Sequence, residues 1–109
     1  AIIISVGINN RNCATPTDKV YLHNLLQRCN KMFPNSSLFM PEINFDEKLP
    51  AQERTVIKGI NKLITTKLGT DYTIPSLPTN NFSTHQTDPV HWTEECANEM
   101  LKHWLVFLN

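Results

Sequence analysis

The stretch Ala1-Ile2-Ile3-Ile4-Ser5-Val6-Gly7 decides the fold that the sequence predicts. Its apolar residues follow one another without the alternation of a half-exposed strand, which is typical of a strand covered on both faces. We therefore expect residues 1–6 to form a central strand of a parallel sheet, which Gly7 ends. The polar residues 8–12 then form a loop at the carboxyl end of that strand, where open α/β sheets bind their ligands.

The remaining apolar patterns predict an alternation of helices and strands. Apolar residues at helical spacing indicate helices over 18–32 and 50–68, which Pro34 and Gly69 stop, and short strands occupy 37–43 and 71–75. Gly59, inside the second helix, indicates close packing. The order strand, helix, strand, helix, strand, loop, helix predicts an α/β fold, with a parallel sheet and helices on both faces. We expect residues 1–109 to form a single domain.

The last helix has the clearest pattern. Thr93 can cap its first turn, and Glu94 and Glu95 are favourably placed against the helix dipole. We expect its apolar stripe, which recurs every three or four residues, to face the core; the stripe comprises Cys96, Ala97, Met100, Leu101, Trp104, Leu105 and Leu108.

Composition restricts the possible partners and compartments. Ten basic and ten acidic side chains cancel, so we expect no direct nucleic-acid binding from this domain. The three cysteines are odd in number and widely spaced, which favours a reducing, intracellular compartment. No apolar run approaches the roughly 20 residues that span a bilayer, and no basic segment resembles a signal peptide. The sequence therefore predicts a cytoplasmic protein.

One polar stretch, Thr87-Asp88-Pro89-Val90-His91-Trp92-Thr93, carries a possible acid–base pair. A carboxylate three residues ahead of a histidine can orient an imidazole that acts as a general base. In a parallel sheet the loops at Asn9, at Asn44 and over 76–91 leave the same edge. Asn9 and the Asp88/His91 pair could then face one cleft, where the Asn9 amide would donate to an oxyanion.

Each of these residues also has a simpler interpretation. Asp88 and His91 could form a surface ion pair at a helix entry, and Asn9 could be a tolerant turn residue. A metal site formed by His85, Asp88 and His91 has only a generic spacing in its favour, so we expect no metal and no cofactor. The candidates for a substrate pocket are residues near the same edge, although loop aromatics often simply cover a core; they are Asn10, Arg11, Asn44, Phe45 and Trp92.

Two blocks resemble a known family. Gly7-Ile8-Asn9-Asn10, after a buried strand, is similar to the Gly-x-Asn-Asp block of the SGNH (GDSL-type) hydrolases, and Asp88-Pro89-Val90-His91 is similar to their Asp-x-x-His block. Within that family the chain resembles the esterase domain in the first open-reading-frame protein of vertebrate LINE-type retrotransposons. The resemblance implies a flavodoxin-like, three-layer α/β/α sandwich that hydrolyses an ester or lipid. By that resemblance Asn9 donates to the oxyanion, His91 is the general base and Asp88 orients it.

The resemblance has two departures. Asn10 stands where the family has aspartate, and the family's nucleophile belongs to a Gly-Asp-Ser block upstream of the asparagine block, which this sequence lacks. We therefore expect the C-terminal part of an esterase domain, without its N-terminal strands and inactive alone. We expect strand 1–6 to be supported by a missing N-terminal segment, by a second copy, or by a rearranged packing. The alternative is a non-catalytic SGNH-like module that contacts lipid or protein in a retrotransposon particle.

Overall fold

Strands and helices alternate along the chain in the predicted order. The structure, a computed structural model, describes residues 1–6, 17–77 and 91–108. Its elements are β1 (Ile2–Ile3), α1 (Thr17–Met32), β2 (Leu38–Pro41), α2 (Ala51–Leu68), β3 (Thr73–Ile74) and α3 (Glu94–Leu108). The predicted α/β class is confirmed. The helix boundaries differ from those predicted by about one residue, whereas the strands are shorter than predicted.

The described strands form one parallel sheet in the order β1-β2-β3. β1 pairs with β2 in the register Ile2 to Leu38, and β2 pairs with β3 in the register Met40 to Thr73. Parallel strands need a crossover between them, and α1 and α2 provide the two crossovers. Pro41 is the last residue of β2, as expected for a residue that cannot donate to the ladder.

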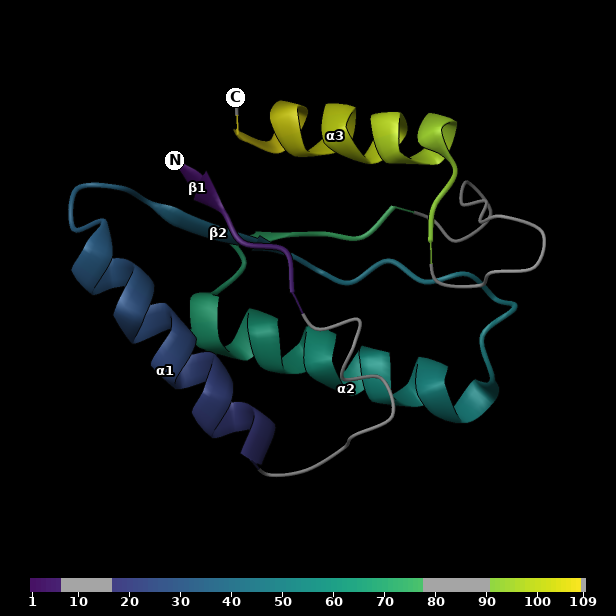
Figure 1. The fold of residues 1–109 in the computed structure, drawn as a ribbon, viewed down its shortest axis with the longest axis horizontal. Helices are drawn as coiled ribbons and strands as arrows, with labels where there is room; N and C mark the ends of the chain where they lie inside the picture. The colour runs from purple at the N-terminus through teal and green to yellow at the C-terminus, as the bar shows by residue number, and fades with distance from the viewer. Residues whose placement is uncertain (7–16, 78–90, 109) are drawn as a thin grey trace.

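Alternate residues of β2 contact different helices. Met40 is fully buried and packs in one cluster with Leu22 of α1 and Ile64 of α2. Phe39, between the buried residues Leu38 and Met40, makes an edge contact with Phe107 of α3, with ring centroids 6.2 Å apart. Figure 1 shows the corresponding arrangement: α1 and α2 lie on one side of the strands and α3 lies on the other.

β1 lies at the edge of the described sheet, so the expectation of a central strand is not met there. The N–H groups of Ile2 and Ile4 donate to the carbonyls of Ser37 and Phe39. Because backbone groups alternate in direction along a strand, the N–H of Ile3 points away from β2. Ile2, Ile3 and Ile4 are only half-buried, since no described strand covers the second edge.

The apolar stripe of α3 is only partly core. Cys96 and Met100 are buried, but Leu101 and Leu105 are 51% and 52% exposed, and Ala97 is exposed as well. The expectation that the whole stripe faces the core is therefore wrong for these three positions. The stripe is wider than the surface that the short described strands offer to α3, so one flank of the helix remains uncovered.

Glycine has different roles at the two described helical positions. Gly69 ends α2 with φ +82°, a left-handed conformation that disfavours side chains, and its N–H donates to the Thr65 carbonyl. Gly59 is exposed in mid-helix, and a Cβ atom built there would meet nothing within 4 Å. The expectation of close packing at Gly59 is therefore wrong.

Gly59→Ala is expected to stabilise the protein by about 0.5–1 kcal/mol, because alanine loses less backbone entropy in a helix than glycine does. Urea unfolding followed by circular dichroism measures the change. Gly69→Ala is the matched control and should lower stability by about 1 kcal/mol, because its positive φ opposes a Cβ atom. Destabilisation by both substitutions would contradict the assignment of Gly59 to an open helix surface.

Candidate functional site at the carboxyl edge of the sheet

The segments that leave β2 and β3 are joined at the carboxyl edge of the sheet. The N–H of Leu77 donates to Asn44 Oδ1 (3.0 Å), and the N–H of Ser76 lies 3.3 Å from Glu42 Oε1. The prediction that the loops at Asn44 and Ser76 share one edge is thereby confirmed. This edge is where α/β sheets bind ligands, because strand ends and crossover loops converge there.

Asn61 of α2 holds the backbone that leads into this edge. Its Oδ1 accepts a hydrogen bond from the N–H of Ile43 (2.6 Å), and its Nδ2 donates to the carbonyl of Ile43 (3.0 Å). Both residues are buried, at 7% and 8% exposure. The amide gives Ile43 the pair of hydrogen bonds that a neighbouring strand would give, and so fixes the chain immediately before Asn44. Asn61 was not among the residues predicted for this edge from the sequence.

Asp46 shapes the next turn. Its Oδ1 accepts from the N–H of Lys48 (2.8 Å), its carbonyl accepts from the N–H of Leu49, and Lys48 Nζ lies 3.9 Å from Oδ2. An aspartate that bonds the backbone two residues onward forms an Asx-turn. The carboxylate is buried at 7% exposure and has this structural use. An aspartate in a short polar turn directly before a helix is a sequence pattern from which this Asx-turn could have been predicted.

α3 is fixed to the same edge from the other face of the sheet. Asn44 Nδ2 lies 3.3 Å from Met100 Sδ, and His103 Nε2 donates to the carbonyl of Pro75 (2.6 Å). Phe107, further along the helix, meets Phe39 within β2. α3 therefore runs antiparallel to β2, and its amino end lies at the carboxyl edge of the strands, as Figure 1 also shows.

His91 lies just ahead of that amino end. α3 begins at Glu94, and the Thr93 hydroxyl accepts from the N–H of Cys96 (3.2 Å), which confirms the predicted cap. His91 is exposed and Trp92 is half-buried. The direction of α3 thus brings the predicted general base to the edge of the sheet at which Asn44 lies.

The other predicted site residues have different positions. Asn9, Asn10, Arg11 and Asp88 lie outside the described residues. Asn44 is buried, and both atoms of its amide are engaged, as described above. Phe45 packs against the core cluster of Ile43, Leu49 and Ile57. Asn44 and Phe45 therefore support the edge of the sheet, and their role in a substrate pocket stays a prediction.

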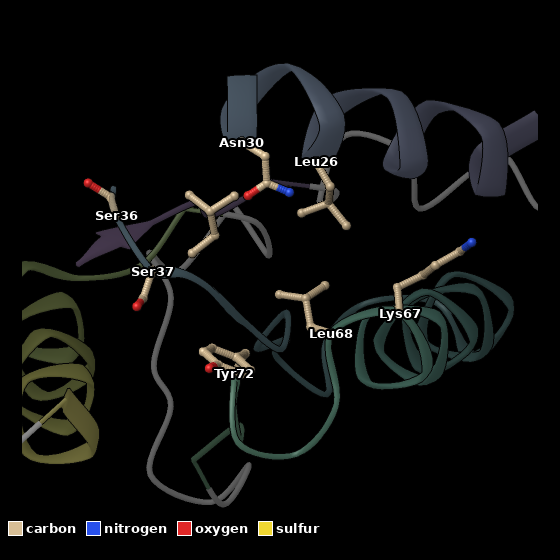
Figure 2. Close-up of a pocket in the computed structure, with 8 residues that line it drawn as sticks. Leu26, Asn30, Ser36, Ser37, Lys67, Leu68 and Tyr72 are labelled. Atoms are coloured by element: carbon tan, nitrogen blue, oxygen red, sulfur yellow. The ribbon is translucent and has the colours of Figure 1, made fainter. Parts of the chain in front are cut away.

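A cavity of about 300 Å³ lies at the opposite, amino end of β2. The ends of α1 and α2 and the residues before β2 form its wall, which comprises Leu26, Asn30, Ser36, Ser37, Leu38, Lys67, Leu68 and Tyr72. Figure 2 shows Leu26, the Asn30 amide and Leu68 pointing toward one another, whereas the Lys67 ammonium points away from them. The described residues of its wall include no histidine or carboxylate, unlike the carboxyl edge, where His91 lies.

Over residues 1–6, 17–77 and 91–108, no group of three or more His, Cys, Asp or Glu side chains could hold a metal ion. In the same part of the chain, every helix is too short or too polar to cross a bilayer. The sequence matches no protein-family model and no curated protein, and no solved structure matches the fold.

Proposed function

We propose that the chain is part of a serine esterase of the SGNH type, in which His91 is the general base, Asp88 orients it and Asn9 donates to the oxyanion. The single observation that carries the proposal is the direction of α3. Because Asn44 and His103 bind α3 near its middle and Phe107 contacts β2, His91 lies at the carboxyl edge of the sheet. A base at this edge can serve a hydroxyl presented by a strand end.

The alternation of parallel strands and helices also supports this proposal. In the sequence, Gly7-Ile8-Asn9 follows the apolar strand β1 and His91 precedes α3, which is the family's order. In the complete domain, the helices on the two sides of the sheet would form the outer layers of a three-layer sandwich. The substrate class would be a carboxylic ester, including acetyl esters, because the amide and the imidazole provide acyl-transfer chemistry without a metal or cofactor.

The edge of β1 that no described strand covers is the proposed position for the nucleophile. None of the serines of the chain follows a Gly-Asp pair, so we assign the attacking hydroxyl to a strand that pairs with β1. That strand would come from a preceding segment or from a second copy. The N–H of Ile3 points toward that side, and the run Ile2 to Ile4 has no lysine or proline to discourage pairing.

The test is hydrolysis of p-nitrophenyl acetate and butyrate by the natural polypeptide that contains residues 1–109, with any residues that precede Ala1. We expect turnover above the buffer rate, and labelling of one serine by a fluorophosphonate that mass spectrometry places on the strand beside β1. Turnover by residues 1–109 alone, with a serine of this chain labelled, would overturn the assignment of the nucleophile. Neither turnover nor labelling in the complete polypeptide would overturn the esterase.

The uncovered flank of α3 favours a second candidate, a non-catalytic module that binds lipid or protein. Leu101 and Leu105 lie one turn apart and are about half exposed, and Val106 is 74% exposed. Contiguous exposed apolar residues are typical of interaction surfaces. Binding through this flank should be unchanged in His91→Ala and lost in Leu101→Ser/Leu105→Ser. If the chain is an esterase, ester hydrolysis should instead be lost in His91→Ala and retained in Leu101→Ser/Leu105→Ser.

A further inference from the structure

The zero net charge of the chain conceals a strong separation of charge. α1 and α2 together carry seven of the ten lysine and arginine residues but only two of the ten acidic residues, a net charge of plus five. The rest of the chain has three basic and eight acidic residues, a net charge of minus five. Because α1 and α2 lie on the same side of the strands (Figure 1), this side of the molecule is basic.

The cations of this side are available to a ligand. Five of them are exposed, namely Arg28, Lys31, Lys58, Lys62 and Lys67. None of the five forms an ion pair with any residue in the described ranges, whereas Lys48 pairs with Asp46 and Lys102 pairs with Glu99. Unpaired cations on one side of a molecule create a positive potential, which attracts an anionic partner over about 8 Å at physiological salt. We call these five residues the basic face.

These residues lie on the exposed surfaces of the two helices, away from the buried positions. On α2 the buried residues are Ile57, Asn61 and Ile64, and Lys58 and Lys62 follow one turn apart on the exposed surface. On α1 the buried residue is Leu22, and Arg28 and Lys31 lie one turn apart near the end of the helix. The two helices pack on each other through Leu22, Leu26, Ile60 and Leu63. At 3.6 residues per turn, Lys58 and Lys62 lie on the flank of α2 turned away from Ile60 and Leu63. The exposed cations therefore form separate clusters on the two helices, on the same side of the sheet.

We propose that the basic face binds the phosphate backbone of nucleic acid without reading its sequence. The outward residues near the cations are polar: Asn24 and Gln27 on α1, and Thr55 and Thr66 on α2. Side chains of this kind, with lysine and arginine, make most protein contacts to phosphate and sugar. A surface that binds membranes instead needs apolar residues that enter the bilayer. The exposed apolar residues of α1 are confined to its ends, at Val20, Tyr21 and Met32.

Fluorescence anisotropy with a labelled 20-nucleotide RNA and a 20-base-pair DNA duplex tests this proposal. We expect Kd values roughly in the micromolar range or weaker at low salt, because the contacts are electrostatic only. With four phosphate contacts, affinity should fall roughly 50- to 150-fold between 50 and 200 mM salt. No detectable binding to either probe at 50 mM salt would overturn the proposal.

Two double variants with the same total charge separate location from net charge. Lys58→Glu/Lys62→Glu should weaken binding at least about tenfold, since it reverses two cations of the basic face. Lys48→Glu/Lys102→Glu changes the total charge equally, but Lys48 lies in the loop after β2 and Lys102 on α3. It should weaken binding less than about threefold. Equal weakening by both pairs would show that net charge alone attracts the probe and would overturn the proposal.

Two further measurements keep the result interpretable. If Lys58→Glu/Lys62→Glu does not fold, Lys58→Gln/Lys62→Gln and its control Lys48→Gln/Lys102→Gln give the same comparison, with a smaller difference in the same direction. Vesicles with 30% phosphatidylserine, compared with neutral phosphatidylcholine vesicles, test the membrane. Binding to the anionic vesicles without binding to either oligonucleotide would assign the basic face to a membrane and overturn the proposal.

Discussion

Replacing His91 with alanine is expected to lower kcat for ester hydrolysis at least about 100-fold in the natural polypeptide, with a small effect on KM. General bases contribute roughly 10² to 10⁴ to the rate, and they act on the nucleophile in the transition state rather than on the bound substrate. Because His91 is exposed, the substitution should change the free energy of unfolding by less than about 0.5 kcal/mol. Initial rates with p-nitrophenyl acetate, together with a urea titration, provide both measurements.

His23→Ala is the matched control, because His23 is also an exposed histidine but lies on α1. It should retain the full rate. Asp88→Asn should lower the rate in the same direction as His91→Ala. The double variant should be no slower than His91→Ala alone, since residues that act as a unit are not additive. Full activity in His91→Ala would exclude His91 as the base, whatever the effect of Asp88→Asn.

The helices could be predicted from the sequence because their signals are local. Apolar spacing, Pro34 after α1, the positive φ of Gly69 and the Thr93 cap each depend on neighbours within one turn. The strands were predicted in the correct order but too long, since the ends of a parallel ladder depend on a distant partner. The apolar run from Ala1 to Val6 predicts a central strand that is covered on both faces. In the structure, β1 lies at the edge of the described sheet.

At the carboxyl edge of the sheet, too, some features could be predicted from the sequence and others could not. Parallel order alone predicts that Asn44 and Ser76 share an edge, and their segments are hydrogen-bonded there. The use of Asn44 as a support, between Leu77 and Met100, could not be predicted because it depends on where α3 docks. Asn61 did leave a signal. It lies four residues after Ile57 and three before Ile64, on the buried stripe of α2, where a polar residue requires a buried partner.

Asn61→Leu is expected to destabilise the protein by about 2–4 kcal/mol. The substitution leaves the N–H and the carbonyl of Ile43 buried without their side-chain partners, and each unsatisfied group costs about 1–3 kcal/mol. Leucine has the same branched shape as asparagine and is not smaller, so the loss does not come from a cavity. A domain of this size is stable by about 5–15 kcal/mol, so the change is large enough to measure by urea unfolding.

Asn24→Leu, on the exposed surface of α1, is the control and should change stability by less than about 0.5 kcal/mol. Asn61→Asp tests the geometry further, because a protonated carboxyl can both accept from the Ile43 N–H and donate to its carbonyl. Burial raises the pKa of such a carboxyl above its unfolded value of about 4. The variant should therefore be closest to the wild type below about pH 4, and it should lose stability progressively as the pH rises. A stability difference from the wild type that is the same at pH 4 and pH 7 would contradict a buried, two-bond amide at Asn61.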